Sequence, residues 1–145
     1  MRWMVYLSVF GLTACGPKHY DLGNHTSHHT GEELHGQAQM IVLRDRKTSI
    51  EKDLTLEFPG DVHVEMAYGD CLYVTTPPGE SWVAASEGEE ESRVSLTLEP
   101  NEVYYFKAYE TVGIRRRFVQ VLHVPALLGP QMLESCRNTR QVEIL

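Results

Sequence analysis

The sequence has little positive charge for its length. Of its 145 residues, 13 are Lys or Arg and 20 are Asp or Glu, which gives a net charge of −7. Binding to nucleic-acid phosphates requires clustered Lys and Arg, so this balance argues against a nucleic-acid partner. It also argues against electrostatic adhesion to anionic lipid, which depends on basic clusters.

The sequence also lacks a pair of residues that would act as nucleophile and base. Residues 79–83, Gly-Glu-Ser-Trp-Val, fail the nucleophile-elbow pattern, which needs glycine two positions after the serine. After residue 36 the only histidines are His63 and His123, and we expect each to be a solvated or packed side chain. A phosphate-binding glycine loop is absent from the sequence. We therefore expect a protein that is not an enzyme and that carries no bound cofactor.

The first apolar run, Met4 to Leu12, follows Arg2 and is too short to cross a bilayer, which takes about 20 apolar residues. No apolar stretch of membrane length follows Cys15. A short apolar run after a basic residue is typical of a secretory signal peptide. Residues 12–15, Leu-Thr-Ala-Cys, resemble the lipobox of bacterial lipoproteins, in which the cysteine becomes the lipid-modified first residue.

This resemblance divides the chain into three parts. It implies a signal peptide at 1–14, a lipidated Cys15 that opens a flexible spacer over 15–36, and a folded domain at 37–145. Gly16, in place of Asp, favours the outer membrane in Gram-negative lipoproteins. The implied partners are a lipid bilayer, held through acyl chains, and an envelope protein on the periplasmic side. Plain secretion after cleavage is the alternative.

Two cysteines remain if Cys15 is acylated. Disulfides form and persist in exported proteins, so Cys71 and Cys136 can form one bridge. The alternative is two buried thiols that pack as small hydrophobic side chains. The sequence leaves both open, because a bridge requires Cα atoms within bonding range.

Histidines are concentrated before the expected domain, at positions His19, His25, His28, His29 and His35. Imidazole is a common ligand of zinc, nickel and copper. Weak metal capture by His25, His28, His29 and His35 is therefore an alternative function. A zinc site needs rigidly held ligands, which a Gly-, Thr- and Ser-rich spacer lacks, so a hydrophilic spacer is the preferred interpretation.

From Gln37 onward, apolar residues recur with the period of β-strands. Residues 54–58, 62–66 and 94–98 alternate apolar with polar, which predicts strands with one buried face. Residues 40–43, 103–106 and 118–124 are apolar at successive positions, as in central strands or strands covered on both faces. We expect one short helix over 130–137 and a last strand over 141–144.

Turn residues separate these runs at short intervals, at 59–61, 69–70, 77–79 and 99–102. Short strands with frequent turns are typical of an all-β sandwich or barrel. We therefore predict an antiparallel β-sandwich of about seven to eight strands with one short C-terminal helix. The acidic run 87–91 is expected to form a charged hairpin tip.

The order of several segments resembles a known family. Residues 74–80 look like a strand that ends in a Pro-Pro-Gly turn, and residues 94–98, 103–107, 118–121 and 132–136 follow in the same order. This order is similar to small bacterial lipoproteins that carry a domain of unknown function with a transthyretin-like, carboxypeptidase-regulatory-like β-sandwich. The resemblance covers roughly residues 41–136 and implies a fold and a cellular address, but no reaction. Asn101 replaces a usual glycine, and asparagine tolerates left-handed backbone angles. Ser81-Trp82 departs from the histidine that is common after the turn.

Two groups are candidate partner contacts. Tyr104 and Tyr105 are consecutive on an expected strand, so one of them must face outward or toward an edge, where an exposed aromatic favours a protein partner. Arg115, Arg116 and Arg117 can bind carboxylates or phosphates through bidentate hydrogen bonds. The alternative for the arginines is protection of a strand start from unwanted pairing.

Overall fold

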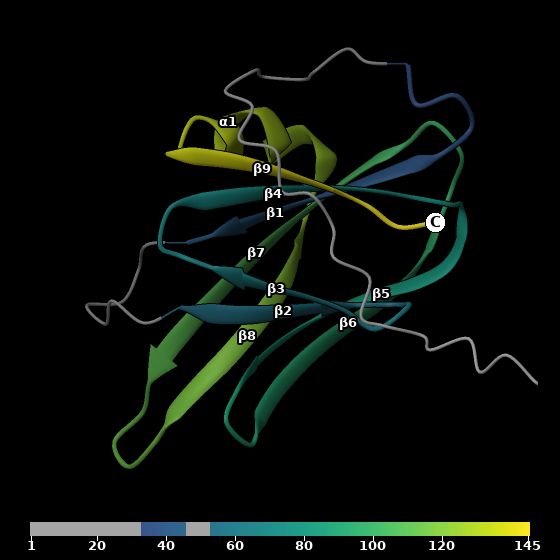
Figure 1. Cartoon of the computed structure of the whole chain (residues 1–145). Coiled ribbons are helices and arrows are strands. Elements are labelled where there is room, and N and C mark those ends of the chain that lie inside the picture. Colours follow the sequence, from purple (N-terminus) through teal and green to yellow (C-terminus); the bar gives the residue numbers. More distant parts are fainter. Residues whose placement is uncertain (1–32, 46–52) are drawn as a thin grey trace, which may run out of the picture.

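The computed structural model describes residues 33–45 and 53–145 (Figure 1). The described strands are β1 (Ala38–Arg44), β2 (Leu54–Phe58), β3 (Val62–Met66), β4 (Asp70–Thr76), β5 (Gly79–Glu87), β6 (Glu90–Leu98), β7 (Val103–Val112), β8 (Arg117–Val124) and β9 (Asn138–Glu143). Between β8 and β9 lie a 3-10 turn, η1 (Ala126–Leu128), and a short helix, α1 (Gly129–Leu133). The expected signal peptide, Cys15 and the spacer up to residue 32 lie outside the described residues.

The strands form two sheets. Sheet A has five strands in the order β8-β7-β1-β4-β9, and sheet B has four in the order β3-β2-β5-β6. The prediction of an all-β, two-sheet fold with one short C-terminal helix is confirmed. The additional strand is β5, which the sequence pattern did not indicate.

Two strand pairs of sheet A are parallel, although an antiparallel sandwich was expected. β1 pairs with β7 and β4 pairs with β9 in parallel register, whereas the other pairs are antiparallel. Parallel neighbours require a crossover connection. The chain between β1 and β7 passes through sheet B twice, as β2–β3 and as β5–β6, and the chain between β4 and β9 ends with the η1–α1 segment.

The main core lies between the two sheets. The alternating residues predicted to face inward on β2 and β3 are buried: Leu54, Leu56, Phe58, Val62, Val64 and Met66. Every residue of β1 is buried, as expected for a central strand that is covered on both faces.

A second apolar cluster covers the outer face of sheet A. Met132 and Leu133 of the α1 segment pack there with Ile41, Leu43 and Tyr73, so the helix forms a third layer (Figure 1). The helix is shorter than the expected 130–137. It ends at Leu133 because the following backbone amides bond three residues back, Ser135 N–H to Met132 O and Cys136 N–H to Leu133 O. None of the helices in the described part of the chain is long and apolar enough to cross a membrane.

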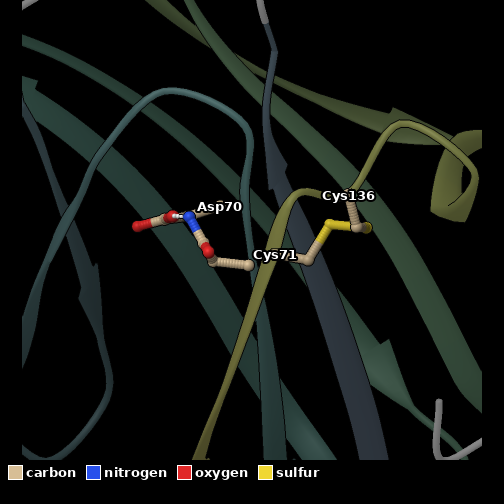
Figure 2. Close-up of a disulfide and its surroundings, with 4 residues drawn as sticks. Asp70, Cys71 and Cys136 are labelled. Atoms are coloured by element: carbon tan, nitrogen blue, oxygen red, sulfur yellow. Dashed lines mark hydrogen bonds between the residues drawn. A yellow bond between two sulfur atoms is a disulfide. The ribbon is translucent and has the colours of Figure 1, made fainter. Parts of the chain in front are cut away.

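A disulfide fixes this third layer to the sheet. Cys71 on β4 bonds to Cys136, which follows α1, with the Cα atoms 5.6 Å apart (Figure 2). Cys71 is fully buried. The bridge joins positions 65 residues apart in the chain, so it ties the C-terminal segment to the central part of the domain.

The strand β8 lies at an edge of sheet A, whereas its apolar sequence suggested a central strand or a strand covered on both faces. Its inward residues Val119 and Val121 belong to the main core. Its outer face carries Leu122, which is 49% exposed. The apolar residues on both faces therefore reflect one core face and one face that is only partly covered.

Candidate functional site

The hairpin of β7 and β8 projects beyond the sandwich (Figure 1). Its strands pair from Tyr105↔Val124 to Val112↔Arg117, and the Gly113 N–H donates to Arg116 O at 2.8 Å across the loop. A Cβ on Gly113 would lie 2.7 Å from the Phe118 ring, so a larger residue there would have to displace this ring. The tip presents apolar surface to solvent: Val112 is 61% exposed and Ile114 is fully exposed.

Two arginines flank this apolar tip. Arg115 is exposed and makes no hydrogen bond or ion pair with any described residue. Arg116 has its Nη1 3.5 Å from Glu90 Oε1, and its guanidinium lies 4.9 Å from the Phe118 ring centroid. Arg117 begins β8, and only its backbone is described. Of the two arginines whose side chains are described, Arg115 is therefore the more available to a partner.

The acidic run lies next to the arginines. Glu87 pairs with Glu90 across Gly88-Glu89, which forms the turn between β5 and β6, so the expected hairpin tip is confirmed. The Arg116–Glu90 ion pair connects the two tips. This end of the sandwich therefore carries one basic and one acidic tip side by side.

The two tyrosines predicted as contacts face opposite sides of sheet A. Tyr104 packs against the main core, and its hydroxyl accepts the Glu99 N–H at 2.9 Å. Tyr105 faces outward, but a Cβ placed on Gly129 would lie 2.4 Å from its ring, so the start of α1 covers it. Both side chains are half-buried, and neither offers a freely exposed aromatic ring.

An uncovered apolar patch, which the sequence analysis did not predict, lies at the opposite end of β8. It consists of Leu122 on β8, 49% exposed, together with Leu127 and Leu128 of η1, 91% and 49% exposed. Leu122 and Leu128 line a groove of about 350 Å³ together with Lys107 and Met132. The sequence signal that would have found it is the absence of Asp, Glu, Lys and Arg between Arg117 and Glu134.

The described histidines are separated from one another. His63 is 2.8 Å from the Asp61 carboxylate at an exposed turn, and His35 lies 3.9 Å from Glu33 with 82% of its side chain exposed. His123 lies beside the Phe106 ring, with centroids 5.3 Å apart. His25, His28 and His29 lie outside the described residues. Within 33–45 and 53–145, no group of three or more His, Cys, Asp or Glu side chains is placed to hold a metal ion.

The buried polar groups have structural partners. Arg44 Nη2 lies 3.2 Å from Glu110 Oε1, and the two side chains are 1% and 0% exposed. Asp70 accepts hydrogen bonds from the Ala67 N–H, the Asn138 side chain and Arg140. Burial raises the pKa of the Tyr73 phenol above its usual 10.0, and the neighbouring Tyr105 adds to this. These groups hold strands together, and Arg44 also lines a groove of about 310 Å³ with Gly69 and Arg137.

Comparison with known proteins adds no relative from which a role could be transferred. No protein-family model matches the chain, and neither a curated protein nor a solved structure matches it.

Proposed function

We propose that this chain is a non-enzymatic binding module of the bacterial envelope, anchored to the outer membrane by lipid on Cys15 and facing the periplasm. The similarity of residues 12–15 to a lipobox supports the anchor. The Cys71–Cys136 bridge supports export, because disulfides persist outside the reducing cytosol. The resemblance to transthyretin-like lipoproteins supports the same location in the cell envelope.

The observation that carries the binding role is the exposed tip of the β7–β8 hairpin. Ile114 is fully exposed there, next to Arg115, whose guanidinium has no partner among the described residues. Such a tip fits an acidic protein surface with a small apolar pocket, since arginine binds carboxylates through two parallel hydrogen bonds. The partner is then an envelope protein with that surface.

The anchor is tested by expressing the full chain in a bacterium with a clickable fatty acid. The wild-type protein is expected to carry the label and to sediment with membranes. Cys15→Ser is expected to lose the label and to leave the membrane fraction. An unlabelled wild-type protein would contradict the proposal.

The partner contact is tested by placing a photoreactive amino acid at position 114 in the full chain. Cross-linking in intact envelopes is expected to give one discrete protein adduct, and Arg115→Glu is expected to reduce its yield about tenfold through the lost ion pairs. The matched control places the same group at Ser95, which is exposed on the polar outer face of sheet B. Equal adducts from positions 114 and 95, or no effect of Arg115→Glu, would contradict the role of the tip.

A further inference from the structure

One end of the sandwich presents an unpaired base and an unpaired acid. Arg115 lies in the loop of the β7–β8 tip, and Glu89 lies in the two-residue turn of the β5–β6 tip. Both side chains are exposed, and neither makes a hydrogen bond or an ion pair with any part of the chain that the structure describes. This surface therefore offers one free positive group and one free negative group to a partner.

The two groups lie on neighbouring hairpins whose relative position is fixed. The residues that follow them in the chain, Arg116 and Glu90, form the ion pair that joins the tips, with Nη1 and Oε1 3.5 Å apart. Farther from the tips, a hydrogen bond of 3.1 Å between a β6 side chain and the β8 backbone joins the same two hairpins. Figure 1 shows the two hairpin ends next to each other. Arg115 and Glu89 are therefore neighbours on one surface of the molecule.

A surface with adjacent opposite charges is complementary to a copy of itself. A two-fold axis between the tips brings the basic tip of each copy onto the acidic tip of the other, so that every contact occurs twice, as in isologous dimers generally. We propose that the chain forms a two-fold dimer through this end, in which Arg115 of each copy pairs with Glu89 of the other. The inference rests on the proposed contact role of the β7–β8 tip, and it names the partner as a second copy of this chain.

The same arrangement covers the exposed apolar side chain of the tip. Ile114 is fully exposed next to Arg115, and Gly88, next to Glu89, is exposed with open space where a Cβ would lie. With Arg115 on Glu89 of the other copy, Ile114 lies against that turn, where Gly88 has no side chain to block its approach. A second copy thus supplies a carboxylate and, beside it, room for an apolar side chain.

Opposite charges set the orientation of this dimer, and the association is weak. Each chain carries a net charge of −7, so two copies repel each other except where their opposite charges meet. Two hairpin tips also give a small interface, as in transient complexes. We therefore expect reversible association, which is measured best by a covalent trap in the envelope.

The test co-expresses two full chains with different epitope tags in a bacterium. A photoreactive amino acid at position 114 of one copy is expected to cross-link to the other copy and to give an adduct that carries both tags. Arg115→Glu in both copies, or Glu89→Arg in both, should lower the yield about tenfold, because each change places like charges together twice. Glu99→Arg makes the same change of charge in an exposed turn at the other end of β6, and it should leave the yield unchanged.

An exchange of charges between the copies distinguishes a two-fold dimer from other contacts. When one copy carries Arg115→Glu and the other carries Glu89→Arg, both contacts again join opposite charges. The yield of the doubly tagged adduct should then return to near the wild-type value, which also shows that both variants fold. No doubly tagged adduct from the wild type, or no recovery in the mixed pair, would overturn the dimer.

The identity of the adduct separates this inference from the proposed function. An adduct at position 114 with a different envelope protein, and none with the second copy, would overturn the dimer and leave the tip as a binding site. The absence of any adduct would contradict both the dimer and the binding role of the tip.

Discussion

At the residue scale, the most deeply buried charges of the described domain belong to Arg44 and Glu110. Both side chains point toward sheet B, since they continue the inward faces of β1 and β7. Arg44→Met leaves the Glu110 carboxylate in the interior, so we expect the free energy of unfolding to fall by about 3–5 kcal/mol. Replacing both residues by Met and Leu should cost clearly less. Urea unfolding of the wild type and the two variants measures this, and a double variant that loses as much as Arg44→Met would contradict the prediction.

Tyr73 links stability to pH at the same scale. Burial raises the pKa of its phenol in the folded state, so the folded state holds the proton over a range in which the unfolded chain has lost it. The contribution to stability is therefore complete below pH 10 and is lost as pH rises through the folded pKa. We expect Tyr73→Phe to lose less stability than wild type between about pH 8 and pH 11. Chemical unfolding of both proteins at pH 8 and pH 11 checks this. Equal losses of unfolding free energy in the two proteins would refute it.

At the element scale, the contact between α1 and sheet A depends on one glycine. Gly129 has an ordinary helical φ of −55°, so its role is spatial: a Cβ would lie 2.4 Å from the Tyr105 ring. We expect Gly129→Ala to destabilise the domain by about 1–3 kcal/mol through overpacking. Tyr105→Leu should cost less in the Gly129→Ala background than alone, because the two sites are in contact. Thermal unfolding of the wild type, the two single variants and the double variant gives the coupling free energy. Additive effects of the two substitutions would exclude the contact.

Most strands could be predicted because alternation reports directly on burial. Residues 54–58 and 62–66 show a clean period of two, and each forms a strand within those bounds. β5 was missed because its buried residues include Ser81, Ala84 and Ala85, which are small and carry no apolar signal. β5 is held by its neighbours β2 and β6, so pairing decides its structure where local propensity does not.

The candidate site was harder to predict, because it depends on which elements cover which faces. The sequence could place Tyr104 and Tyr105 on opposite faces, but not the start of α1 over Tyr105. It could place the arginines at a strand start, but not the contact of Arg116 with Glu90, which needs two hairpins to meet. The leucine patch was missed for the same reason, since an apolar edge strand and an apolar central strand have similar sequences.

At the scale of the whole molecule, side chains connect the two sheets along both of their edges. The Ser92 hydroxyl of β6 accepts the Val121 N–H of β8 at 3.1 Å. On the other side, Arg140 of β9 donates to the Glu65 carbonyl of β3. The exposed outer face of sheet B is polar, and its side chains bond to one another, as Thr97 does to Glu80. Among the described residues, the exposed large apolar side chains therefore lie on sheet A and its connections, and none lies on the strands of sheet B.

The disulfide stabilises the whole molecule by restricting the conformations of the unfolded chain. It joins positions separated by 65 residues, and the chain-entropy relation for a loop of that length gives about 4 kcal/mol of stabilisation. We expect the double change Cys71→Ala and Cys136→Ala to lower the free energy of unfolding by about that amount, and reduction of the wild type with dithiothreitol to give a similar loss. Urea unfolding of the oxidised, reduced and double-variant proteins measures it. Because the bridge also holds the segment after α1 on sheet A, hydrogen exchange in α1 should increase more than in sheet B under native conditions. A loss below about 1 kcal/mol would mean that the unfolded chain stays compact around these positions without the bridge.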